Sequence, residues 1–195
     1  MPLDDFKKYE FKQSEVLFIK EREVAGTSAA KGICQELCWK WMKRMHTKLG
    51  KYGTPKDRMN ALWKESTVDK AIDHHNNPAL MKSGAQSGYG IQKGNYARAW
   101  GYDMGLVNRW HQKRGGLFIS FRYVNDDNVL HAIAFYSPAN TLATTLFFFD
   151  SNQGEYEISL GMFHKFLPDY LKEKYGSSMS DIVEVFVYGE PDQLV

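Results

Sequence analysis

The sequence lacks several features that mark whole classes of protein. It has only two cysteines among 195 residues, too few for a disulfide framework or a four-thiolate zinc site. It has no apolar run of about 18 residues, so we expect no membrane span. The charges nearly cancel, with 25 Lys and Arg against 23 Asp and Glu. The large basic excess of many nucleic-acid-binding proteins is therefore absent, and we expect no nucleic-acid partner.

The start of the chain also lacks the basic and then apolar pattern of a secretory signal peptide. We therefore expect a protein of the cytoplasm of the cell that makes it. Its six histidines show no His-Glu-x-x-His spacing, and we expect neither a metal site nor a cofactor. A hydrophobic content of 43% and a charged content of 25% are typical of globular proteins. We predict a single domain over residues 1–195, with residues 1–14 as a loose N-terminal arm.

The first half of the sequence has helical periodicity. Apolar residues recur on one helix face at Cys34, Cys38, Trp41, Met45 and Leu49, which predicts a helix over residues 29–49. One or two shorter helices are expected between residues 56 and 82. Residues 84–105 hold six glycines among aromatic residues, which indicates a flexible loop of the kind that lines a cleft.

The second half has the period of strands. Runs rich in β-branched and aromatic residues predict strands over residues 117–124, 129–136, 144–149 and 181–188, with a helix over 159–174. The turn residues 125–128 make the first two strands an antiparallel hairpin. Helices followed by strands predict an α+β fold with an antiparallel sheet.

Three residues carry chemistry in this arrangement. Cys34 lies near the start of the predicted helix, where the helix dipole favours the nucleophilic thiolate. His131 lies in a strand and would pair with the thiolate, and Asp150 ends the next strand and would orient the imidazole. Each residue also has an ordinary interpretation, as a buried thiol, a packed histidine or a turn aspartate. We assign Cys38, one turn after Cys34, to the core.

The sequence around these residues resembles the YopT/AvrPphB-type papain-like cysteine proteases, a family of bacterial effector enzymes. The resemblance rests on three blocks in the same order: Gly32, Cys34, Leu37 and Trp41; His131 opening the apolar run 131–136; and the aromatic run 147–149 that ends in Asp150 with Asn152 and Gly154 after it. It implies a papain-like fold, a Cys34–His131–Asp150 triad that cleaves a protein or peptide substrate, and a secreted effector that acts in a host cell.

The resemblance also implies an oxyanion hole with two donors. The backbone N–H of Cys34 would be one of them. Papain-like enzymes often place a glutamine about six residues before the cysteine, where this sequence has Ser28. Ser28 and Asn152 are therefore the candidates for the second donor or for a substrate contact.

Two alternatives to a protease stay open. The same triad on a papain-like scaffold also supports deamidation or acyl and amide transfer, because water or an amine can resolve the thioester. A binding module without turnover is the other alternative, and Cys34→Ala would separate it from both enzymes. Its recognition surface would consist of aromatic residues that could equally fill the core: Tyr89, Tyr96, Trp100, Tyr102 and Trp110.

Overall fold

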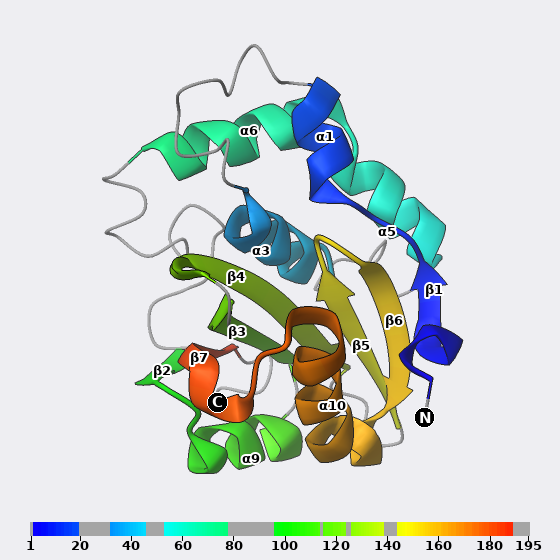
Figure 1. The fold of residues 1–195 in the computed structure, drawn as a ribbon. Coiled ribbons are helices and arrows are strands. Elements are labelled where there is room, and N and C mark those ends of the chain that lie inside the picture. The colour runs from blue at the N-terminus through cyan, green and yellow to red at the C-terminus, as the bar shows by residue number, and fades with distance from the viewer. Residues whose placement is uncertain are drawn as a thin grey trace.

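The computed structural model describes residues 2–19, 32–45, 53–77, 96–113, 115–123, 126–138 and 144–188. Within these ranges a seven-stranded sheet lies between two groups of helices (Figure 1). The helices are α1 (Gln13–Ile19), α3 (Cys34–Met45), α5 (Pro55–Leu62), α6 (Glu65–Asn76), α9 (Met104–Lys113) and α10 (Phe163–Tyr175), with short 3-10 turns η1 (Leu3–Phe6), η3 (Leu160–Met162) and η4 (Met179–Asp181). The strands are β1 (Lys7–Tyr9), β2 (Tyr96–Trp100), β3 (Gly115–Tyr123), β4 (Asp126–Ser137), β5 (Thr145–Asp150), β6 (Gly154–Ser159) and β7 (Ile182–Tyr188).

The strands follow the order β1-β6-β5-β4-β3-β7-β2, and each neighbouring pair is antiparallel. The α+β fold with an antiparallel sheet is thus confirmed, and so is the β3–β4 hairpin. The last strand of the described ranges, β7, lies between β3 and β2. Strand β2 can therefore join the sheet only when β7 is in place.

Both faces of the sheet are buried. On one face α3 packs on the sheet, where the Trp39 ring stacks on Phe118 at 4.8 Å between ring centroids, and residues of α5 and α6 belong to the same core. On the other face α9 and α10 cover residues such as Phe148, which contacts Phe166 at 5.2 Å between ring centroids. Burial on both sides explains why these strands read as nearly continuous apolar runs. Aromatic side chains supply much of both cores.

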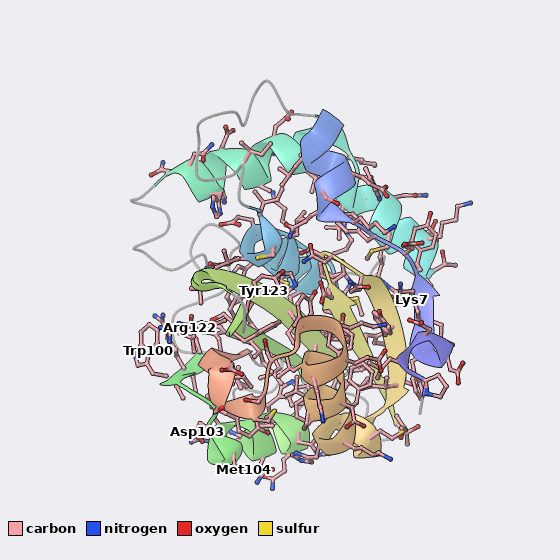
Figure 2. All side chains as sticks on the ribbon, in the orientation of Figure 1. Lys7, Trp100, Asp103, Met104, Arg122 and Tyr123 are labelled. Carbon is pink, nitrogen blue, oxygen red and sulfur yellow. The ribbon has the colours of Figure 1, made fainter. Side chains whose placement is uncertain are left out.

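Residues 78–95 lie outside the described residues, so the loop predicted over residues 84–105 can be compared with the structure only in its second part. That part differs from the prediction. Strand β2 occupies part of it because Ala97 and Ala99 pack inward. Helix α9 follows because the Asp103 carboxylate accepts a hydrogen bond from Leu106 N–H at 2.8 Å, an N-terminal cap. Trp100 is 72% exposed and points away from the body of the protein (Figure 2).

Of the other aromatic residues singled out from the sequence, Trp110 is fully buried and Tyr102 is partly buried against the core. Trp110 donates a hydrogen bond to the carbonyl oxygen of Gly115 at 3.0 Å. Tyr89 lies outside the described residues. A recognition surface built from the whole aromatic set is therefore not formed, because Trp110 fills the core.

The N-terminal segment is ordered, in contrast to the loose arm expected for residues 1–14. Strand β1 pairs with β6 at the edge of the sheet, with Lys7 opposite Tyr156. Phe11 is buried and packs against Phe149 at 5.7 Å. The reason is Gly154: a Cβ there would come within 2.0 Å of the Tyr9 carbonyl oxygen, so only glycine lets the segment approach this closely.

Candidate active site

Cys34 is the first residue of α3. The helix predicted over residues 29–49 is described over Cys34–Met45, so it begins later than expected, at the thiol itself. Gly32, two residues earlier, has a φ of 129° that turns the chain into it. The first N–H groups of a helix have no intrahelical acceptor and carry the positive end of the dipole. The Cys34 thiol is partly exposed, and its Sγ lies 3.9 Å from the carbonyl oxygen of Leu130.

Cys38, one turn further along α3, behaves differently. It is fully buried, and its thiol donates to the carbonyl oxygen of Ala132 at 3.3 Å. Burial raises the pKa of Cys38 well above that of an ordinary thiol. The assignment of Cys38 to the core is confirmed. Cys38 is therefore a suitable internal control in experiments on the reactivity of the Cys34 thiol.

His131 lies on β4 and is only 1% exposed. Aromatic rings enclose the imidazole: Phe121 at 5.5 Å, Tyr123 at 5.9 Å and Tyr175 at 4.9 Å between ring centroids. Its Nε2 is 2.9 Å from Asp150 Oδ1, and the residue before it, Leu130, is the one whose carbonyl oxygen lies 3.9 Å from Cys34 Sγ. Because Nε2 faces the carboxylate, Nδ1 is the ring nitrogen left for the thiol.

Asp150 is the last residue of β5 and is fully buried. Strand pairing places it opposite Ile133, two residues beyond His131, which brings the carboxylate to the imidazole. Its Oδ1 accepts a second hydrogen bond from the backbone N–H of Asn152 at 2.7 Å. The three residues singled out from the sequence thus lie together, contributed by a helix and two adjacent strands.

Two tyrosines of α10 complete the surroundings of Asp150, and the sequence analysis missed their role. The hydroxyl groups of Tyr170 and Tyr175 donate to Oδ2 at 2.7 and 2.5 Å. The Tyr175 hydroxyl also lies 3.0 Å from His131 Nε2. Asp150 therefore has partners on both oxygens, as a buried carboxylate requires. In the sequence α10 shows only an apolar helix face, which gives no sign of these contacts.

The electrostatics of the site favour a charged pair. Burial alone would lower the pKa of His131, but the charges of Asp150 and Cys34, with the hydrogen bond to Asp150, outweigh it and raise the pKa to about 10. Burial works to raise the pKa of Asp150, yet the charge of His131 and the hydrogen bonds from His131, Tyr175 and Asn152 lower it. Imidazolium and carboxylate are thus the stable forms in the neutral range.

Of the two residues considered as further oxyanion or substrate contacts, Ser28 lies outside the described residues. The side-chain amide of Asn152 is used inside the protein: Nδ2 donates to the Tyr123 hydroxyl at 3.1 Å, and Oδ1 accepts from Gln13 Nε2 at 2.7 Å. Gln13 also accepts a hydrogen bond from the backbone N–H of Ile33 at 3.0 Å. The sequence analysis missed Gln13, because it looked for a glutamine about six residues before Cys34 and Gln13 comes much earlier in the sequence.

The described residues offer no other site of comparable chemistry. No group of three His, Cys, Asp or Glu side chains among them is arranged to hold a metal ion. His75 lies on α6, where its Nδ1 is 3.1 Å from Glu36 Oε2. None of the helices in the described ranges is long and apolar enough to cross a membrane.

Comparison with solved structures gives an independent view of this architecture. The chain is similar to the crystal structure of the Pseudomonas avirulence protein AvrPphB, with a TM-score of 0.54 over 96% of this chain and 98% of that chain. The two sequences are 16% identical over the match. No protein-family model and no curated sequence matches the chain. The fold implied by the sequence resemblance is therefore confirmed at the level of structure.

Proposed function

We propose that this chain is a cysteine endopeptidase that cleaves peptide bonds in protein substrates. The observation that carries the proposal is a partly exposed thiol at a helix start, beside the strand residue that precedes a buried imidazole, which is itself hydrogen-bonded to a buried carboxylate. Cys34 is the nucleophile, His131 the acid and base, and Asp150 the residue that holds the imidazole. The same order of roles defines the Cys-His-Asp type of triad.

The reaction begins with the Cys34 thiolate and the His131 imidazolium. The sulfur attacks the carbonyl carbon of the scissile bond, and the π electrons move to the oxygen. The backbone N–H of Cys34 at the helix start is available to hydrogen-bond this oxyanion. When the oxyanion collapses, the C–N bond breaks, and His131 Nδ1 gives its proton to the leaving amine, which leaves a thioester on Cys34.

Water then resolves the thioester. His131, now neutral, takes a proton from the water as its oxygen attacks the thioester carbon. Collapse of the second oxyanion breaks the C–S bond and releases the acid product with the Cys34 thiolate, so the starting pair is restored. Asp150 keeps its charge throughout and favours the protonated imidazole, for which the raised pKa of His131 is the physical basis.

The similarity to AvrPphB supports a biological setting for this activity. That protein is an avirulence protein of Pseudomonas. By analogy we extend the proposal to a bacterial effector whose substrates are proteins of a host cell. Fold analogy carries this extension, whereas the site geometry carries the chemistry.

The decisive experiment measures cleavage with matched cysteine variants. Purified protein is incubated with unfolded casein and with a peptide library, and new peptide termini are identified by mass spectrometry. Cys34→Ala should abolish cleavage, whereas Cys38→Ala should retain it, because Cys38 is a buried neighbour on the same helix.

Three other results would overturn the protease proposal. A change in substrate mass without a cut chain would indicate deamidation, and an added amine would indicate transfer. Cleavage that survives Cys34→Ala would remove the nucleophile from the mechanism.

A further inference from the structure

The side chain of Gln13 connects the two halves of the site. Gln13 is the first residue of α1 and is 8% exposed. Its Oε1 accepts from the backbone N–H of Ile33 at 3.0 Å, and its Nε2 donates to Asn152 Oδ1 at 2.7 Å. Ile33 directly precedes the nucleophile, and Asn152 lies in the turn after Asp150. One amide thus spans the gap between the start of α3 and the end of β5.

Asn152, which binds Gln13 in the turn after Asp150, is itself held by hydrogen bonds. The backbone N–H of Asn152 donates to Asp150 Oδ1 at 2.7 Å, and its side-chain Nδ2 donates to the Tyr123 hydroxyl at 3.1 Å. Asp150 Oδ1 in turn accepts from His131 Nε2. A displacement of Asn152 would therefore reach the carboxylate that holds the imidazole.

The main chain that carries Gln13 is anchored to the same turn. The backbone N–H of Gln13 donates to the Ser151 carbonyl oxygen at 2.7 Å. Because the backbone of Gln13 is held in this way, the side-chain amide reaches Ile33 from a fixed base.

On the nucleophile side the amide lies against a glycine. A Cβ at Gly32 would be 3.4 Å from Gln13 Nε2 and 3.5 Å from Oε1. A side chain at position 32, two residues before Cys34, would therefore pack directly against this amide. Gly32 also has a φ of 129°, a conformation that glycine adopts without strain.

We propose that Gln13 is a positioning residue, which sets the separation between the Cys34 thiol and the His131–Asp150 pair. The inference rests on the proposed function, because it concerns the same three residues. Misplacement of a reacting group by about 1 Å can cost about 100-fold in rate. The N-terminal segment is then a working part of the site, and its amide bridge does more than stabilise the fold.

The test compares two variants of the same segment. Gln13→Leu keeps the size of the side chain and removes both hydrogen bonds of the bridge. Phe11→Leu loosens the packing of the segment and leaves the amide in place. If Gln13→Leu does not fold, Gln13→Asn replaces it, because the shorter amide cannot reach both partners.

The readout is the pH profile of iodoacetamide alkylation at Cys34, followed by mass spectrometry with Cys38 as the internal slow thiol, on variants with wild-type circular dichroism. In the wild type we expect Cys34 to be alkylated much faster than Cys38 at pH 6, as the proposed thiolate–imidazolium pair requires. Gln13→Leu should reduce this rate by at least about 10-fold and move the profile towards that of an ordinary thiol, since the pair is pulled apart. Phe11→Leu should keep the wild-type profile.

The failures of the two proposals give different results. If the wild type itself shows no fast alkylation below pH 7, the thiolate–imidazolium pair and with it the proposed function fail. If the wild type shows it and folded Gln13→Leu keeps the same rate and profile, the positioning role is refuted. An equal effect of Phe11→Leu would also refute it, because the amide bridge would then have no role of its own.

Discussion

Replacement of Asp150 by asparagine tests the electrostatics of the site most directly. An ordinary histidine has a pKa of about 6.5, so a value of about 10 means that the surroundings favour the imidazolium by about 5 kcal/mol. An opposite charge in contact accounts for about 1–3 pKa units. We therefore expect Asp150→Asn to lower the pKa of His131 by about that amount, with the remainder due to Cys34 and opposed by burial.

The geometry lets asparagine fit without a clash. Its carbonyl oxygen can keep the hydrogen bonds from His131 and from the Asn152 backbone that now reach Oδ1. Its amide nitrogen would then face the hydroxyl groups of Tyr170 and Tyr175, which can turn to accept. The variant should therefore fold, and its effect should be that of the lost charge.

The assay is an NMR titration of the His131 ring nitrogens, with Asp169→Asn as a control that removes an exposed carboxylate beside Tyr170. Stability should follow the same pKa. Because folding raises the pKa of His131, its contribution is complete below about pH 6.5 and is lost as the pH rises to about 10. The difference in urea unfolding free energy between wild type and Asp150→Asn should therefore shrink over that range. An unchanged His131 pKa in the variant would refute the reasoning.

Three further changes should act through other contacts. Arg58→Met should lower the free energy of unfolding in urea by about 3–5 kcal/mol, because it leaves the fully buried Glu155 carboxylate without its ion pair. Adding Glu155→Gln should recover part of this loss, and an unchanged midpoint for Arg58→Met would contradict the prediction. Gly154→Ala should lower the free energy of unfolding by about 2 kcal/mol or more, since the added Cβ would meet the Tyr9 carbonyl oxygen at 2.0 Å and φ is 117°. The control Gly161→Ala, whose Cβ would have no atom within 4 Å, should change it by no more than about 0.5 kcal/mol in the same assay. Tyr175→Phe removes a hydrogen bond that lowers the pKa of Asp150, so an NMR titration of the Asp150 carboxyl carbon should show a higher pKa in the variant; a lower pKa would contradict this.

The sequence was sufficient to predict the elements that carry the candidate triad. Helix α3 has a clear apolar face, and strands β4 and β5 are long runs of β-branched and aromatic residues because the sheet is buried on both sides. Cys34 and Asp150 lie at the ends of these elements, and His131 lies within one. Local pattern thus reached them without knowledge of the tertiary structure.

Other parts of the site depend on contacts between distant segments, which no local pattern reports. Gln13 and Asn152 are 139 residues apart, and Gln13 lies in a segment whose polar composition suggested an arm. In the sequence Tyr170 resembles any other core residue of α10, and only the tertiary structure shows that its hydroxyl binds Asp150. The glycines around β2 obscured the strand and α9, because single glycines indicate loops whenever tertiary packing is unknown.

The position of the first strand has a consequence for how the protein is made. The ribosome synthesises β1 long before its partner β6, and β2 joins the sheet only through β7, which is synthesised later still. Such non-local pairing is typical of domains that fold slowly, in milliseconds to seconds. A nascent chain that has not reached Asp150 carries Cys34 and His131 without the carboxylate or the N-terminal bridge. We therefore expect Cys34 to reach its proposed active form only after residues 150–152 have been synthesised, so the topology itself delays the chemistry.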